Sequence, residues 1–124
     1  MTIKVKKVIV VDNREEDREQ VKEYLEDNNC HVRTLGSLEE LEGEILSDKP
    51  DIVIMGIMFP PKRDTEGIKE YEKLKEKGLL NKENTIFMSY RDDKRVQKLI
   101  EKLGCSFFKK PHDFFNLIEA VNKA

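Results

Sequence analysis

The sequence has few cysteines, and neither lies in a metal or redox pattern. Cys30 and Cys105 are the only two among 124 residues, and no CxxC spacing is present. This excludes a zinc site or a dithiol redox motif built on cysteine. In the fold predicted below, the two cysteines open strands at opposite edges of a sheet, too far apart for an internal disulfide.

Long apolar runs and an excess of one charge are absent as well. No stretch approaches the ~20 apolar residues that cross a bilayer, and residues 1–7 lack a signal-peptide core. We therefore expect a cytoplasmic protein without membrane contact. The 23 basic and 25 acidic side chains give a net charge of −2, so no general attraction to nucleic acid is expected.

Internal repeats and linkers are missing, and the length fits one hydrophobic core. We expect a single domain over residues 1–124 with no output domain. Apolar runs without alternation are typical of strands buried on both faces of a sheet, whereas mixed runs are typical of edge strands. The apolar runs are residues 8–11, 52–55 and 86–88, and the mixed ones are 31–35 and 106–110.

Helical patterns separate these runs. Ser37 and Glu40 form a capping-box pattern that predicts the start of the second helix, with Leu46 on its inner face. Asp64 is expected to cap the third helix, although it could also swing toward the site described below. The remaining helices are predicted over residues 14–28, 65–77 and 91–103 and from residue 113 onward.

Five strands that alternate with five helices predict an α/β fold with right-handed crossovers. Placing the apolar strands in the centre gives the order 2-1-3-4-5. The predicted architecture is therefore a flavodoxin-like, doubly wound (βα)5 three-layer sandwich with a parallel five-stranded sheet.

Residues 50–61 organise the chain. Pro50-Asp51 leads into a buried strand that stops at Gly56, and Pro60-Pro61 closes the following loop. This stretch resembles the third strand of bacterial response-regulator receiver domains. That family carries an Asp at the position of Gly56, which accepts a phosphoryl group from a histidine kinase. The resemblance therefore identifies the chain as a degenerate receiver, or pseudo-receiver, whose phosphoacceptor position is vacant.

The resemblance covers the whole chain and assigns further residues at the strand ends. The acidic pair that holds Mg²⁺ in the family matches Asp12 and Asn13, with Met58 nearby in the pocket. The hydroxyl residue of the fourth strand matches Ser89. The Lys that precedes a Pro after the fifth strand in this family matches Lys110-Pro111, whose peptide bond is expected to be cis. The family's switch aromatic matches Phe107.

Physical chemistry limits what this site can do. A glycine supplies no nucleophile for an acyl phosphate, so phosphorylation at Gly56 is excluded. Magnesium prefers carboxylate oxygens, and Asp12 is the one acid left of three, so Mg²⁺ binding is expected to be weak. No nucleophile–base pair is present, and we expect no enzymatic activity. A partly buried Lys110 needs a charge partner, and we expect it to pair with Asp12 or with a bound anion.

The leading functional hypothesis is a signalling module of two-component phosphorelays that acts by protein contacts. The resemblance implies partners such as a histidine kinase or another regulator on the face formed by residues 92–123, and a homodimer is possible. One alternative is a phosphorylatable receiver in which Gly56 is engineered or another Asp substitutes for it. A second alternative is an anion or small-ligand sensor, because the missing side chain leaves space beside Ser89 and Lys110.

Overall fold

The computed structural model describes residues 5–91, 93–110 and 114–123. The five strands found there are β1 (Lys6–Val11), β2 (Cys30–Leu35), β3 (Ile52–Met55), β4 (Thr85–Ser89) and β5 (Ser106–Lys109). The five helices are α1 (Glu15–Glu26), α2 (Leu41–Asp48), α3 (Glu66–Glu76), α4 (Lys94–Leu103) and α5 (Phe114–Lys123).

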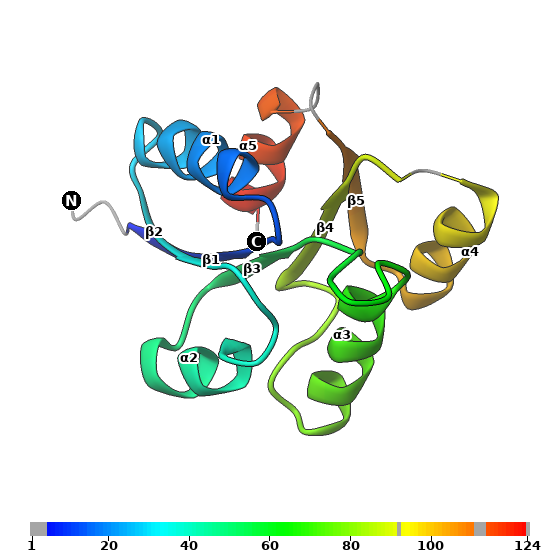
Figure 1. The fold of residues 1–124 in the computed structure, drawn as a ribbon. Coiled ribbons are helices and arrows are strands. Elements are labelled where there is room, and N and C mark those ends of the chain that lie inside the picture. Colours follow the sequence, from blue (N-terminus) through cyan, green and yellow to red (C-terminus); the bar gives the residue numbers. More distant parts are fainter. Residues whose placement is uncertain (1–4, 92, 111–113, 124) are drawn as a thin grey trace.

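All strand pairs are parallel, and the sheet order is β2-β1-β3-β4-β5 (Figure 1). The predicted fold class and order are confirmed. The fully apolar runs form the central strands because both faces of the sheet are covered by helices. The half-polar runs lie at the two edges, where one side of the backbone ladder is open.

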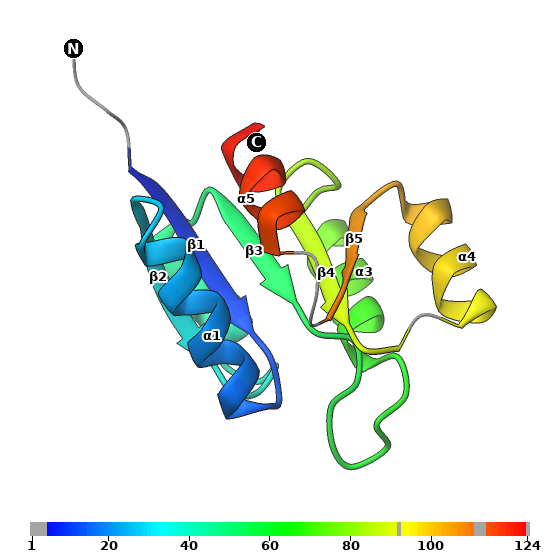
Figure 2. The same ribbon diagram turned by 90° about the horizontal axis from the view of Figure 1, so that it is seen from above.

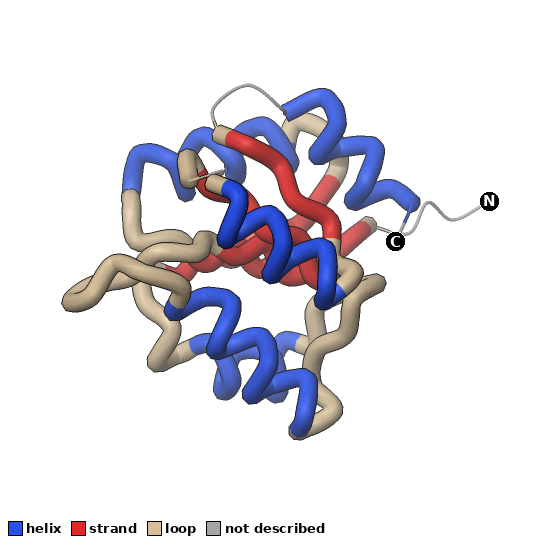
Figure 3. Tube along the Cα trace, turned by 90° about the vertical axis from the view of Figure 1, so that its right-hand side faces the viewer, coloured by secondary structure: helices blue, strands red, loops and turns tan. Residues whose placement is uncertain are grey.

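Two hydrophobic clusters lie on opposite faces of the sheet, which makes the molecule a three-layer sandwich (Figure 3). Alternate residues of each strand enter different clusters: Ile9 and Val11 pack with helices α2, α3 and α4, whereas Val8 and Val10 pack with α1 and α5. This alternation follows from the period of two along a strand. Because the sheet is parallel, the carboxyl ends of β1, β3 and β4 meet at one edge (Figure 2).

Residues with left-handed backbone conformation follow several helices. Gly78 and Gly104 follow α3 and α4 with φ of 76° and 77°, and Asn29 follows α1 with φ of 65°, which is typical of helix ends. Cys30 and Cys105 are free thiols. No helix in the described part of the chain is long and apolar enough to cross a membrane.

Other local predictions are wrong. The capping box at Ser37 does not start a helix: α2 begins at Leu41, and no side chain caps it. With only Leu41 and Ile45 turned to the core, this short helix leaves Leu46 56% exposed. Asp64 does not cap α3, because its carboxylate is bound by arginines elsewhere.

Some predictions fall outside the described residues. They are the cis bond at Lys110-Pro111 and the start of the last helix at residue 113.

Candidate functional site

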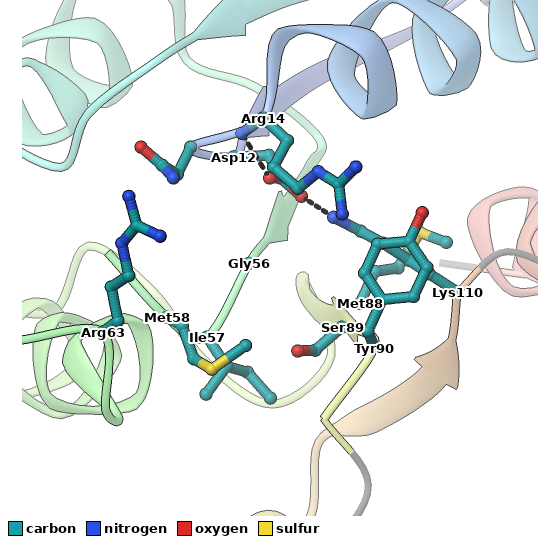
Figure 4. A pocket seen from close by; sticks show the side chains of 11 residues that line it. Asp12, Arg14, Gly56, Ile57, Met58, Arg63, Met88, Ser89, Tyr90 and Lys110 are labelled. Atoms are coloured by element: carbon teal, nitrogen blue, oxygen red, sulfur yellow. Dashed lines mark hydrogen bonds and ion pairs between the residues drawn. The ribbon is translucent and has the colours of Figure 1, made fainter. Parts of the chain in front are cut away.

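A pocket of about 480 Å³ opens at the carboxyl edge of the sheet (Figure 4). Strand ends and the loops that follow them supply its walls. The lining residues are Asp12, Asn13, Arg14, Gly56, Ile57, Met58, Arg63, Met88, Ser89, Tyr90 and Lys110. Six of the seven predicted site residues are therefore brought together, although they lie far apart in the sequence.

Asp12 follows β1 directly and is 7% exposed. Its Oδ1 accepts a hydrogen bond from the Arg14 backbone N–H at 2.9 Å, and its Oδ2 accepts one from the Lys110 ammonium. The Asp12 carbonyl accepts a further bond from Arg18 at 2.8 Å. Both carboxylate oxygens are thus engaged inside the protein, and the carboxylate is fixed in position.

Lys110 lies just after β5 and is 6% exposed. Its ammonium pairs with Asp12 and also with Asp17, whose Oδ2 is 3.0 Å away. Its backbone N–H donates to the Ser89 carbonyl at 3.0 Å, which ties the end of β5 to the end of β4. The predicted pairing of Lys110 with Asp12 is confirmed. A buried ammonium held by two carboxylates is fully compensated, as a buried charge must be.

Asp17 is the residue of this cluster that the sequence analysis missed. It lies in the first turn of α1, is 7% exposed, and its Oδ1 accepts a hydrogen bond from the Tyr90 hydroxyl at 3.3 Å. A signal was present: Asp17, Val21 and Leu25 are spaced four residues apart and share the inner face of α1. An acid in line with core residues indicates a buried charge partner.

Arg14 and Tyr90 cover this ion cluster. The Arg14 guanidinium lies over the Tyr90 ring at 5.0 Å from the centroid, and the Lys110 ammonium lies 5.4 Å from the same centroid. The Arg14 Nε atom is also 3.5 Å from Asp17 Oδ2. A cation on an aromatic face is stabilised by the ring quadrupole, so the three cation–acid and cation–ring contacts support one another.

Gly56 directly follows β3, and its N–H donates to the carbonyl of Val11 at the end of β1, at 2.8 Å. A Cβ at this position would be 3.3 Å from Asp12 Oδ2. The Asp12 carboxylate therefore borders the space that a side chain at position 56 would enter. Position 67 has no room for a side chain, because a Cβ there would lie 2.0 Å from the Gly56 carbonyl oxygen. The Gly67 N–H donates to the Ile57 carbonyl at 2.9 Å, and this bond holds the start of α3 against the pocket.

Ser89 and Phe107 occupy different environments. Ser89 is 4% exposed, and its Oγ accepts a hydrogen bond from the Arg91 N–H at 3.0 Å. Its hydroxyl faces the pocket across from Gly56 (Figure 4). Phe107 does not line the pocket; it is partly buried and packs against the core cluster of α3 and α4.

The loop between β3 and α3 is held by charged side chains. Glu66 accepts hydrogen bonds from the backbone N–H groups of Phe59 and Asp64, at 3.0 and 2.8 Å. Asp64 Oδ1 is 3.0 Å from the Nη1 atom of Arg91 and 3.1 Å from the Nη1 atom of Arg95. Arg91, and then Arg95, hold the pKa of Asp64 below its usual value, since both favour the ionised carboxylate.

The donor set of the pocket does not fit Mg²⁺. This ion takes oxygen ligands and is usually held through one or two free carboxylates. Only Asp12 offers a carboxylate to the pocket, and both of its oxygens already accept hydrogen bonds. Nowhere in the described ranges do three His, Cys, Asp or Glu side chains gather into a group that could hold a metal ion. Asn13 supplies only a neutral amide.

A parallel α/β sheet with polar residues converging at the carboxyl ends of its central strands is the arrangement of doubly wound ligand and signalling domains. The chain belongs to the response regulator receiver domain family, which it matches over residues 8–122. Members of this family bind Mg²⁺ at the phosphorylation site in general, and they interact with kinases and other signalling proteins. Receiver domains are generally signalling modules rather than enzymes.

Solved structures of receivers have the same fold. The chemotaxis protein CheY4 of Vibrio cholerae has a TM-score of 0.80 and 15% identity, with 97% of this chain and 98% of that chain covered. A response regulator receiver protein of Pseudoalteromonas atlantica has a TM-score of 0.82 and 22% identity, with 94% of each chain covered. No curated protein matches the sequence.

Proposed function

We propose that this receiver domain transmits signals through protein contacts and does not accept a phosphoryl group. The observation that carries the proposal is that, among its described residues, the pocket has no free carboxylate and no unpaired lysine. Gly56, which we align with the family's phosphoacceptor, has no side chain, and Lys110 is already neutralised by Asp12 and Asp17. An acyl phosphate needs a carboxylate oxygen as nucleophile, and the Asp12 carboxylate is occupied by Lys110 and the Arg14 N–H.

In this proposal the domain is held in one state by its internal ion cluster. Signals would then reach it through differential binding of a partner rather than through phosphorylation. The partner would be a histidine kinase or another regulator, bound on the face formed by residues 92–123, or a second copy of the chain. The family's contacts with signalling proteins support this reading.

Incubation with acetyl phosphate and Mg²⁺, followed by intact-mass measurement, tests the proposal. We expect the mass of the wild-type chain to stay unchanged. The variant Gly56→Asp restores a carboxylate beside Ser89 and serves as the matched control, and a mass gain of one phosphate in that variant shows that the assay works. A gain of one phosphate in the wild-type chain would contradict the proposal.

Asp64 is the alternative acceptor that sequence reasoning left open. Its carboxylate is bound by Arg91 and Arg95 and does not line the pocket. These contacts argue against Asp64 as a substitute nucleophile. Should the wild-type chain gain phosphate, peptide mapping of the modified residue would show whether Asp64 carries it.

Anion binding is a second candidate function, and the cations of the pocket favour it. Arg14 and Arg63 add two guanidinium groups to the rim, while Lys110 is balanced by its two acids. Guanidinium groups bind oxyanions through paired hydrogen bonds. Titration with inorganic phosphate, read from amide shifts at residues 12, 56 and 89, tests this function. Arg63→Gln should remove the shifts and the neighbouring Lys62→Gln should keep them.

A further inference from the structure

Helix α4 carries a basic flank that is separate from the pocket at the sheet edge. Five of its residues surround an open hollow of about 480 Å³: Lys94, Arg95, Lys98, Leu99 and Lys102. The four charged residues are exposed, and Leu99 is partly buried against the core. We call this surface, defined by these five residues, the α4 basic flank.

The flank is an ordered row of charge. Lys94, Lys98 and Lys102 are spaced four residues apart and therefore lie along one side of the helix, roughly 6 Å apart along its axis. Glu101 is the one acid of α4, and it does not line the hollow. A local concentration of four cations in a chain with net charge −2 is not a consequence of overall composition.

One carboxylate already binds at the edge of this flank. Asp64, from the loop between β3 and α3, accepts a hydrogen bond from Arg95 at 3.1 Å. The next cations along the row, Lys98 and Lys102, form no ion pair with any other residue that the structure describes. The internal contact of Asp64 with Arg95 thus shows how this surface receives an acidic side chain and leaves two further positions open.

We propose that the α4 basic flank binds an acidic segment of a protein partner that places one apolar side chain on Leu99. This rests on the proposed function, because it names the partner class of a domain that acts by contacts. Acids spaced four residues apart on a partner helix would match the row of lysines, and charge complementarity of this kind gives specificity. Leu99 provides the apolar centre that such an interface needs.

The chemistry favours a protein over a nucleic acid. A sugar–phosphate backbone offers no apolar group for Leu99, and the net charge of −2 gives the chain no general attraction to a long polyanion. The family's general association with signalling proteins agrees with this choice.

The test uses the full chain and a synthetic helical peptide with glutamate at every fourth position and one leucine between. Binding is measured by fluorescence anisotropy at about 0.15 M salt, and the contact surface by amide shifts of the isotope-labelled chain. We expect saturable binding with shifts confined to residues 94–102. The double variant Lys98→Glu/Lys102→Glu should weaken binding at least about tenfold, and replacing the peptide's leucine by alanine should weaken it about fivefold.

Lys62→Glu/Lys69→Glu is the matched control, because it changes the net charge equally at two other exposed lysines. Binding in this variant should stay within about twofold of wild type, since distant charges are screened. Absence of saturable binding at millimolar peptide would overturn the proposal. So would an equal loss in both double variants, or tighter binding of a duplex oligonucleotide at the same lysines. None of these readouts involves phosphorylation of the chain, so they are independent of the mass measurement that tests the proposed function.

Discussion

Lys110 and Lys98 carry the same ammonium group on the same flexible stem, in two very different regions. Lys110 is 6% exposed and is held between Asp12 and Asp17 behind the Tyr90 ring. Lys98 lies on the open surface of α4, in a row of cations. Lys110 therefore stabilises the fold, whereas Lys98 is exposed and can be reached by a partner.

The difference is one of solvation. A buried charge loses its water and must be compensated by neighbouring groups, so its removal exposes the remaining partners to the full cost of desolvation. An exposed charge keeps its water and contributes little to stability, but it acts on approaching molecules and is weakened by salt. The three predictions below test this contrast, from the largest expected effect to the smallest.

Lys110→Met should lower the free energy of unfolding by about 3–5 kcal/mol, because it leaves two buried carboxylates without their cation. Urea unfolding followed by circular dichroism measures the change. Lys98→Met removes the same charge at an exposed position and should leave the unfolding midpoint close to wild type. Neutralising both acids in the triple variant with Asp12→Asn and Asp17→Asn should recover part of the loss. Equal midpoints for the two single variants would refute the contrast.

Asp17→Asn should lower the free energy of unfolding by about 1–2 kcal/mol, because Lys110 keeps Asp12 as a partner but loses a charged hydrogen bond. The exposed Glu16→Gln on the same turn of α1 is its control and should change stability little. The Asp17→Asn effect should persist at high salt, since a buried pair is poorly screened. A loss that disappears with added salt would mean that Asp17 acts only as a surface charge.

The smallest change in stability is expected from the ion pairs of Asp64, because this residue lies nearer the surface. Its pKa is held below the usual value by Arg91 and Arg95. A carboxyl whose pKa is lowered on folding adds stability above its unfolded pKa of about 3.9, and that stability is lost as the pH falls through the lowered value. Carboxyl NMR titration should show a higher Asp64 pKa in Arg91→Gln and no change in Arg33→Gln, where the arginine pairs with Glu44 instead.

Much of the fold and most of the candidate site could be predicted from the sequence, for a local reason. Apolar runs such as residues 8–11 and 52–55 mark central strands, and a polar residue that directly follows a parallel strand must lie at the carboxyl edge of the sheet. The resemblance to receiver domains pointed to Asp12, Ser89 and Lys110, and this rule explains why all three lie at that edge. The helix inner faces followed from spacing wherever a helix was long enough to define one.

The errors share a different cause. Ser37 and Glu40 fit the capping pattern, but packing of Leu41 and Ile45 starts α2 later and turns Leu46 to solvent. Asp64 fits a cap, but two arginines from the following strand–helix unit bind it instead. In each case a tertiary contact outweighed a local preference of about 1 kcal/mol.

The sequence by itself determined the layers, the strand order and the absence of a side chain at position 56, because each depends on residues close together in the chain. Only the tertiary structure decided where the charge of Lys110 is balanced. Asp17 lies 93 positions away along the chain, and no local pattern links the two. A buried ion pair is formed by whichever charges the packed helices and strands bring into contact, and that choice is made in three dimensions.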